Sequence, residues 1–338
     1  MKNKNTQYAS GWIKRFLTEY VITEKNLSKN TQLSYRDTFR LLLGFMVKET
    51  RKTVNKMLLE DFSPDLIKKF LNNLETERLC SVSSRNQRLA AIHAFTKFVG
   101  LHSPENVEWC RQLNMIPFKK TQTKQITYLE KEEMDALLNA PDCATSRGRR
   151  DYALLLFLYN TGARADEVAQ LSIGDLCIPA SLKKGFASAT IKGKGNKIRK
   201  CPLWENTVEN LKALICNRAS SEPVFLNRFN QPITRFGIYS IVDKYAKKIT
   251  DEFPGIKGKR LSPHTIRHTT ATHLLQSGVD INTIRAWLGH VSVDTTNIYA
   301  EINLQMKAKA LACCEIVRDK GMGHWRDNQD LMNFLDNL

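Results

Sequence analysis

The chain has 338 residues, of which 42% are hydrophobic, and this length is enough for two domains that each bury a core. Lys and Arg number 51 against 34 Asp and Glu, and the net charge of +17 favours a polyanionic partner, although charge alone does not separate DNA from RNA or from an anionic membrane surface. The sequence shows neither a signal-peptide-like start nor a run of about 20 apolar residues, so we expect a cytoplasmic protein with no membrane partner.

A first, all-helical domain is predicted over residues 1–117. Apolar residues recur at helical spacing in four stretches between residues 7 and 99, and a fifth helix is expected near 106–113. Ser28, Ser63 and Ser81 stand where helix N-caps are expected. The pattern therefore predicts an N-terminal all-α helical bundle.

A polar and basic segment, residues 118–127, follows Pro117 and predicts an interdomain linker. Its lysines are Lys119, Lys120 and Lys124. They fit two interpretations equally well, contact with a phosphate backbone or a solvated tether.

Residues 128–310 predict a second domain of mixed structure, followed by a polar tail at 311–338. Two strands, 186–192 and 196–203, flank the hairpin signal Gly193-Lys194-Gly195. Helices are expected at 129–139, 150–159, 204–217, 234–249, 263–276, 280–288 and 293–310. The predicted fold class is mainly α with a small antiparallel β-sheet, an α+β domain preceded by the helical bundle.

The eight cysteines are scattered along the chain, and none forms a C-x-x-C pair. In a reducing compartment such thiols stay free. We therefore expect small buried or half-buried thiols rather than a zinc site or a disulfide framework.

Arg164 and Glu167 lie three residues apart in the segment Thr161–Glu167, just after an apolar helix. Gly162 permits a tight reversal there, and a spacing of three places both charged residues on one face of a following helix. The carboxylate could then orient the guanidinium through a charge-assisted hydrogen bond. Most pairs at this spacing are surface ion pairs, so the motif is weak by itself.

The segment from Ser262 to His268 predicts a helix start, with Ser262 as N-cap and Pro263 in the first turn. His264 and Arg267 would share one face close to the helix N-terminus, which favours anions. A phosphate site and an ordinary surface helix start are equally good interpretations. For His268 and His273 we expect structural roles.

His290 and Tyr299 are nine residues apart, which puts them on roughly opposite faces of one unbroken helix. Leu288-Gly289-His290 reads as a helix stop, and Ser292 can cap a new helix. The break would let an imidazole and a phenol meet at one site. A single Tyr is more often a packing residue.

The hairpin tip places Lys194 on an exposed turn, with Lys192 and Lys197 as close alternatives. Such a turn is usually a solvated basic loop. The functional alternative is a lysine that reaches into DNA as a proton donor.

Together and in this order, the segments TGARADE, IKGKGNK, SPHTIRH and WLGHVSVDTTNIY resemble the tyrosine recombinase (phage integrase) family, in particular bacterial mobile-element integrases and transposases. The N-terminal helical region also resembles that family's core-binding domain, so the resemblance covers residues 7–310. Agreement of several motifs is far more specific than any one of them. Many members carry larger apolar residues or a small polar one in place of Ala163, Ala165 and Asp166. These departures leave the candidate phosphate-binding residues unchanged and bear on local packing.

The resemblance implies a site-specific DNA recombinase that cleaves and rejoins strands through a 3′-phosphotyrosyl intermediate, for integration, excision or transposition of a DNA element. The implied roles are Tyr299 as nucleophile, Arg164 and Arg267 as phosphate clamps, Lys194 as proton donor to the leaving oxygen, His264 as general acid/base or relay, His290 as phosphate hydrogen-bond donor and Glu167 as support for Arg164. Fixed cations of this kind stabilise a phosphoryl transition state. We therefore expect no ATP, metal or other cofactor.

The resemblance also implies an assembly on double-stranded DNA. Two domains clamp the duplex, and a homotetramer holds two recombination sites, while the free protein is a monomer or weak dimer and is nucleoid-associated. Residues 311–338 either dock onto a neighbouring protomer or fold back on their own domain, with Leu331, Met332, Phe334 and Leu335 as apolar anchors.

Two alternative functions stay open at this point. One is a type IB-like DNA topoisomerase, which the motif spacing and the separate N-terminal helical domain argue against. The other is a catalytically silent DNA-binding protein of the same fold, which the complete set of charged residues and Tyr299 argues against.

Overall fold

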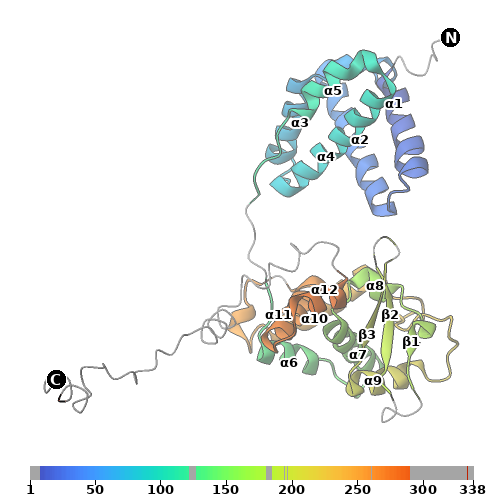
Figure 1. Cartoon of the computed structure of the whole chain (residues 1–338), viewed down its shortest axis with the longest axis vertical. Coiled ribbons are helices and arrows are strands. Elements are labelled where there is room, and N and C mark those ends of the chain that lie inside the picture. Colours follow the sequence, from blue (N-terminus) through green and yellow to red (C-terminus); the bar gives the residue numbers. More distant parts are fainter. Residues whose placement is uncertain are drawn as a thin grey trace. The chain divides into compact units, whose positions relative to one another are not determined.

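The computed structural model describes residues 8–121, 127–179, 185–193, 195, 197–259, 261–289 and 333. The chain separates into two compact units, Met1–Lys124 and Gln125–Leu338, and each has its own hydrophobic core (Figure 1). Among the described residues, no helix is both long and apolar enough to cross a membrane.

The first unit is all-helical, as predicted. It contains α1 (Ala9–Arg15), a π-helical continuation (Phe16–Glu24), α2 (Lys29–Thr50), α3 (Pro64–Thr76), α4 (Val82–His102) and α5 (Val107–Asn114), with 3₁₀ turns at Val54–Lys56, Leu59–Asp61 and Pro104–Asn106. Ser28, Ser63 and Ser81 each accept a hydrogen bond from the backbone N–H three residues further on. These three N-cap predictions are confirmed, and they explain where α2, α3 and α4 begin.

Phe16 lies at the centre of this bundle and is fully buried. Its ring centroid is 5.8, 5.5 and 5.7 Å from those of Phe39, Phe95 and Phe98. Aromatic groups at such separations bury large apolar areas and favour edge-to-face contact. The aromatic cluster therefore ties α2 and α4 to the π-helical segment, which the sequence pattern did not predict.

The start of the predicted linker is held to the first unit. The Nζ atom of Lys119 lies 2.7 Å from the carboxylate of Glu75, and the backbone N–H of Lys119 donates to Asn86. Residues 122–126, which include Lys124, lie outside the described part of the chain. Lys119 is therefore already engaged in an ion pair within the protein.

The second unit combines helices with a small sheet, which confirms the predicted fold class. Its elements are α6 (Lys131–Asn139), α7 (Ser146–Thr161), α8 (Ala165–Ala169), β1 (Leu176–Cys177), β2 (Ser188–Lys192), β3 (Ile198–Pro202), α9 (Glu205–Ile215), α10 (Arg235–Ile249), α11 (Pro263–Gln276) and α12 (Ile281–Leu288), with 3₁₀ turns at Ile173–Asp175 and Pro254–Ile256. The helix expected at 293–310 lies outside the described residues.

The sheet is antiparallel with the strand order β1-β2-β3. In the register of β2 with β3, Ile191 pairs with Arg199 and Ala189 pairs with Cys201. Side chains on a strand alternate between faces, so Arg199 and Cys201 share one side of β3. That side faces the interior, because Cys201 is fully buried.

α7 is the central helix of this unit, and Leu154, Leu155 and Leu158 on it are fully buried. α11 packs against α7, and α12 packs against α11 and β3. Figure 1 shows the sheet at one side of the unit, with α7 beside β3. This packing brings the C-terminal end of α7 close to the first turns of α11 and to the end of α12.

The cysteine prediction is only partly correct. Cys110 and Cys201 are buried and Cys80 is half-buried, but Cys143, Cys177 and Cys216 are exposed. The six described cysteines are all free thiols. The exposed ones occupy turn or edge positions, where a small side chain covers no core.

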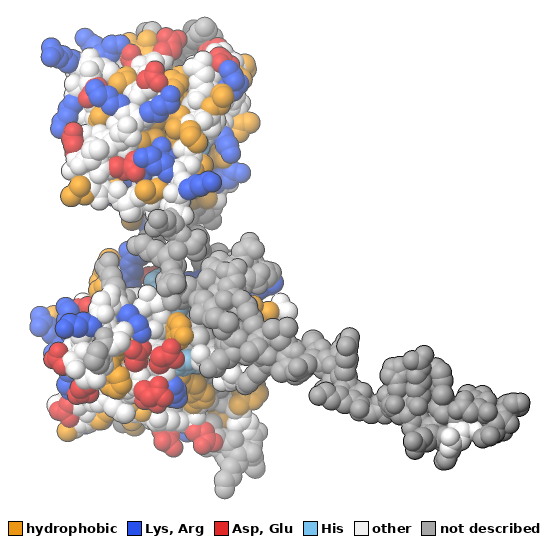
Figure 2. All heavy atoms as spheres, turned by 90° about the vertical axis from the view of Figure 1, so that its left-hand side faces the viewer, with side chains coloured by type: hydrophobic (Ala, Val, Ile, Leu, Met, Phe, Trp, Pro, Cys, Tyr) orange, Lys and Arg blue, Asp and Glu red, His pale blue; other side chains and the backbone are white. Residues whose placement is uncertain are grey.

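Charge is unevenly distributed over the surface. On the face shown in Figure 2, basic and acidic side chains are interspersed on the first unit, and the second unit has several acidic side chains near one another. The overall surplus of positive charge is therefore not a uniform coating.

Candidate active site

Arg164 and Glu167 form one corner of the candidate site, where α7 ends and α8 begins. Gly162 follows α7 with a positive φ of 58°, and Arg164 is the N-cap residue of α8. Glu167 accepts from the backbone N–H of Arg164 at 2.9 Å with Oε2 and from its Nη1 at 2.9 Å with Oε1. The spacing of three residues thus produces the predicted orientation of the guanidinium by the carboxylate.

Arg199 is a second partner of Glu167, and the sequence pattern did not single it out. Its Nη2 atom donates to Glu167 Oε2 at 2.6 Å, and the side chains of Arg199 and Glu167 are 10% and 5% exposed. The Nε atom of Arg199 is buried and has no hydrogen-bond partner within the described chain. A buried guanidinium with an unused donor is costly unless something compensates it.

Two glycines pack directly on this ion pair. A Cβ atom on Gly193 would lie 3.2 Å from Glu167 Oε1, and one on Gly289 would lie 3.2 Å from Arg199 Cδ. Gly193 precedes Lys194, and Gly289 precedes His290. The Glu167–Arg199 pair therefore touches both chain segments that lead into those predicted site residues.

His264 and Arg267 come from the start of α11, where Ser262 is the N-cap and Pro263 occupies the first turn as predicted. Arg267 is 3% exposed, and its Nη1 and Nη2 atoms donate to the carbonyls of Gly162 at 2.6 Å and Leu288 at 2.7 Å. A guanidinium has five N–H donors, so these two bonds fix its plane. Arg267 thereby joins the end of α7 to the end of α12.

The electrostatics of this group follow from burial and neighbouring cations. Burial, followed by the charges of Arg267 and Arg164, lowers the pKa of His264 below its ordinary value. Burial alone would raise the pKa of Glu167, but its hydrogen bonds to Arg199 and Arg164 hold that pKa below the usual range. Near neutral pH the imidazole is therefore neutral and the carboxylate is charged.

The structure brings four of the predicted site residues together: Arg164, Glu167, His264 and Arg267. Lys194, His290 and Tyr299 lie outside the described residues. The stop predicted before His290 is confirmed at Gly289, which ends α12 with a positive φ of 67°. Lys192, one of the alternative lysines, forms an ion pair with Asp175 at 3.1 Å.

Arg199 could have been suspected from strand alternation alone. It lies two residues before Cys201 on β3, so it occupies an inward-facing position. A charged residue at such a position needs a buried partner. The partner, Glu167, is 32 residues away in sequence, and local pattern does not reveal that distance.

Three guanidinium groups and one carboxylate give this cluster a net positive charge. Planar guanidinium forks match the oxygens of a phosphodiester. In the part of the chain that the structure describes, no group of three or more His, Cys, Asp and Glu side chains is arranged to hold a metal ion. The chemistry that these residues favour is the binding and polarisation of a phosphate.

Comparison with known proteins agrees with this geometry. The profile of the phage integrase family matches residues 127–306, and that of the phage integrase N-terminal SAM-like domain matches residues 13–100. The chain is 35% identical to the integrase/recombinase y4rC of Sinorhizobium fredii over 96% of this chain and 97% of the relative. It is 30% identical to the tyrosine recombinase XerC of Pelobacter propionicus over 83% of this chain and 88% of the relative.

Two solved structures share the fold. The XerH site-specific recombinase bound to its difH substrate superposes with a TM-score of 0.63 at 22% identity, over 90% of this chain and 84% of that one. The Tn1549 transposon integrase in complex with a circular intermediate DNA superposes with a TM-score of 0.67 at 16% identity, over 90% of this chain and 99% of that one.

Proposed function

This chain belongs to the phage integrase family and is a tyrosine-type site-specific DNA recombinase, and from that premise we propose that it binds duplex DNA and exchanges strands through a 3′-phosphotyrosyl bond made by Tyr299. The observation that carries the proposal is the convergence of Arg164, His264 and Arg267 beside the glycine that precedes His290. A polyanion also suits the net charge of +17.

In the proposed step, the oxygen of Tyr299 forms a bond to the scissile phosphorus while the bond from phosphorus to the 5′ oxygen breaks. Arg164 and Arg267 hold the non-bridging oxygens, where negative charge accumulates. Lys194 gives its proton to the leaving 5′ oxygen. The phenolic proton of Tyr299 passes to His264, whose lowered pKa keeps the imidazole unprotonated and able to accept it.

Rejoining is the same step in reverse. The 5′ hydroxyl of a partner strand attacks the phosphotyrosyl bond and frees Tyr299. A covalent intermediate divides one difficult displacement into two easier ones and conserves the energy of the phosphodiester. The reaction therefore needs no nucleotide cofactor to drive religation.

We further propose that the exchange serves integration, excision or transposition of a DNA element. The support is the similarity to the Sinorhizobium fredii protein named as an integrase/recombinase, over nearly the whole chain. Exchange between two duplexes requires four cleavages, so we propose a homotetramer on two sites. Sedimentation of the protein with and without DNA tests that assembly.

A nicked duplex tests the nucleophile. The duplex is first recovered by binding selection with the full-length protein. A nick a few nucleotides to the 3′ side of the cleavage point lets the short fragment that carries the new 5′ hydroxyl diffuse away, which traps the covalent complex. The wild-type protein should give an SDS-stable adduct, and Tyr299→Phe should give none. Tyr152→Phe is the matched control and should keep the adduct, because within the described residues the Tyr152 hydroxyl accepts a hydrogen bond from Asn206 and from no other group.

Three outcomes would contradict the proposal. An adduct formed by Tyr299→Phe would show that another residue is the nucleophile. A selected duplex that binds but yields no adduct with the wild-type protein would favour a silent DNA-binding protein. Relaxation of a one-site plasmid without recombination of a two-site plasmid would favour a topoisomerase.

A further inference from the structure

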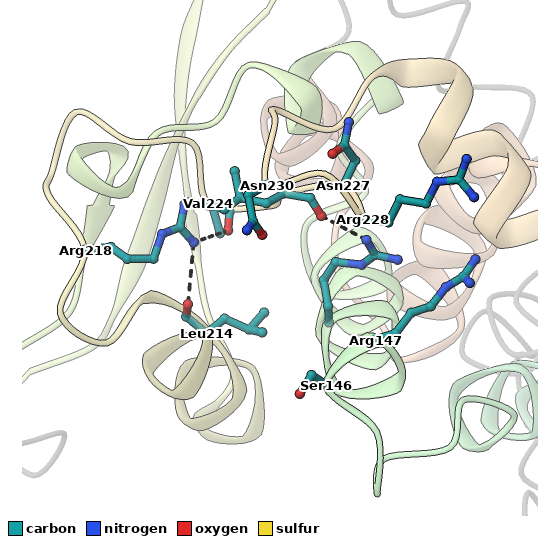
Figure 3. A pocket seen from close by; sticks show the side chains of 10 residues that line it. Ser146, Arg147, Leu214, Arg218, Val224, Asn227, Arg228 and Asn230 are labelled. Carbon is teal, nitrogen blue, oxygen red and sulfur yellow. Dashed lines mark hydrogen bonds between the residues drawn. The ribbon is translucent and has the colours of Figure 1, made fainter.

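A second basic site lies in the second unit of the chain, in a pocket of about 430 Å³ (Figure 3). The start of α7, the end of α9 and the loop before α10 form it. Ten residues line it, and none of these is acidic: Ser146, Arg147, Arg150, Leu214, Arg218, Val224, Leu226, Asn227, Arg228 and Asn230. Its volume is in the range of sites that bind small molecules.

The pocket is separate from the candidate active site. It lies at the N-terminal end of α7, whereas Gly162 and Arg164 follow the C-terminal end. A helix of 16 residues is about 24 Å long at 1.5 Å per residue. A ligand of nucleotide size in this pocket cannot reach the Arg164–Arg267 cluster.

Two of the four arginines are fixed parts of the wall. Arg150 donates from Nε to Asp151 at 2.9 Å and from Nη1 to the carbonyl of Leu226 at 2.9 Å. Arg218 donates from Nε to Glu222 at 3.1 Å and from Nη1 to the carbonyl of Val224 at 3.1 Å. Their charges are largely neutralised, and their bonds hold the pocket in shape without a ligand.

The other two arginines have no such partners. Within the described chain, neither Arg147 nor Arg228 forms a hydrogen bond or an ion pair, and the Arg228 guanidinium lies 4.6 Å from the centroid of the Phe229 ring. Figure 3 shows both guanidinium groups extending to the same side of the pocket. Arg147 and Arg228 are both exposed, and an anion held by both guanidinium groups would offset their positive charge.

The rest of the pocket lining is apolar or uncharged, which a site for a small inorganic anion would not need. The half-buried Leu214 and Leu226 form an apolar wall, and Asn227 and Asn230 add amide groups. A flat heterocycle can lie against such a wall while amides bond to its edge. In a B-form duplex the bases are stacked, and only the phosphates could enter.

From these features we infer that the pocket binds a free mononucleotide. Its phosphate is held by Arg147 and Arg228, and its base lies against Leu214 and Leu226. Bidentate guanidinium contacts to phosphate are among the stronger polar interactions in proteins. This inference does not rest on the recombination chemistry, since it concerns the opposite end of α7.

Calorimetric titration of the full-length protein tests this, with deoxyadenosine 5′-monophosphate, deoxyadenosine and inorganic phosphate as probes. The nucleotide should bind at least ~10-fold more tightly than either fragment. The double variant Arg147→Ala/Arg228→Ala should weaken nucleotide binding at least ~10-fold, because it removes both charge-assisted contacts. Its unfolding curve should match the wild type, since within the described residues neither side chain forms a hydrogen bond or ion pair that would be lost.

Two control variants locate the bound nucleotide. Arg149 is on the same turn of α7, but its guanidinium bonds to the carbonyls of Cys143 and Ala144 and does not line the pocket. Arg149→Ala should therefore change affinity less than ~2-fold. Arg164→Ala should also leave nucleotide binding unchanged.

Loss of binding in Arg164→Ala would place the nucleotide in the candidate active site and overturn the inference. Equal binding of inorganic phosphate and nucleotide would reduce the pocket to a bare anion site. Displacement of the nucleotide by a DNA duplex would make the pocket part of the DNA surface. Each of these results contradicts a free-nucleotide site.

Discussion

Arg199 on β3 donates a hydrogen bond to Glu167 on α8 at 2.6 Å, and this buried ion pair links the sheet to the guanidinium of Arg164. Glu167 accepts from both arginines, so Arg164 is oriented through a carboxylate that Arg199 itself holds in place. The pair also lies against Gly193 and Gly289. One interaction thus touches three separate segments of the candidate site.

Replacing Arg199 with Met should therefore affect both stability and activity. The substitution leaves Glu167 buried with only Arg164 as a charged partner, and breaking a buried pair costs about 3 kcal/mol in the free energy of unfolding. Adduct formation should fall more than DNA affinity, since Arg199 acts through Arg164. Urea unfolding and the rate of adduct formation measure the two effects.

The double variant Arg199→Met/Glu167→Gln separates these effects. It removes the buried carboxylate charge that has lost Arg199 as a partner, so it should regain part of the lost stability. It should not regain adduct formation, because Arg164 then lacks the carboxylate that orients it. If the double variant were fully active, the pair would be structural only.

Gly289→Ala should destabilise the protein through two causes. The position has a φ of 67°, where a side chain costs about 1–2 kcal/mol, and the new Cβ would lie 3.2 Å from Arg199 Cδ. Gly278 is the matched control, since its φ is 86° but an added Cβ meets nothing within 4 Å. Gly278→Ala should show only the backbone cost, and chemical unfolding of both variants measures the difference.

Equal losses for the two glycine variants would show that the contact with Arg199 is easily relieved. In that case, Gly289→Ala should also leave adduct formation close to that of Gly278→Ala. A larger loss of activity in Gly289→Ala is the expected result, since the residue directly precedes His290.

Local features of the site could be predicted from the sequence because they depend on neighbouring residues. Ser262 and Pro263 start α11, which puts His264 and Arg267 on one face. Gly289 stops α12 because only a residue tolerant of positive φ continues the chain there. The Arg164–Glu167 contact likewise spans only three residues.

Contacts between distant segments could not be predicted in this way. Arg267 bonds to carbonyls 105 and 21 residues away, and no periodicity in the sequence encodes those partners. Arg199 looked like one more basic residue on a hairpin that is already rich in lysine. The π-helical segment after Arg15 was also missed; its first residue, Phe16, packs against rings on α2 and α4, and such contacts are not encoded in the local pattern.

Stability should fall as the pH is lowered from 7.5 towards 5. Burial, then the charges of His264 and Arg267, lowers the pKa of His268 to about 4 from an ordinary value of 6.5, and burial also lowers the pKa of His264. Below pH 6.5 the unfolded chain therefore binds protons that the folded chain does not, and the free energy of unfolding decreases. Urea unfolding at pH 7.5, 6.5 and 5.5 measures this.

Glu167 does not contribute to the change in stability over this pH range. Its pKa is lowered in the folded protein, so the stabilisation that it provides is lost only below pH 4.5, the ordinary pKa of the group. His268→Gln should show a smaller loss between pH 7.5 and 5.5 than the wild type. An equal loss in both proteins would mean that His268 is not the group whose protonation opposes folding.

Arg267→Lys tests whether the buried guanidinium is needed for its shape as well as its charge. Lysine keeps the charge but has one nitrogen on a shorter side chain, which cannot take the places of both Nη1 and Nη2, so we expect the bonds to Gly162 and Leu288 not both to be kept. With these groups buried, we expect a loss of about 2–4 kcal/mol in the free energy of unfolding. Adduct formation should drop ~100-fold, because a preorganised donor to the phosphate is displaced.

Arg149→Lys is the matched control, because Arg149 also donates to two backbone carbonyls, those of Cys143 and Ala144, but at an exposed position. Water can replace those bonds, so this variant should lose less than about 0.5 kcal/mol and keep full adduct formation. Unfolding by urea and adduct formation on the nicked duplex measure both variants side by side. If Arg267→Lys behaved like Arg149→Lys, a positive charge alone would be sufficient at position 267, and the link from α7 to α12 would not position the site.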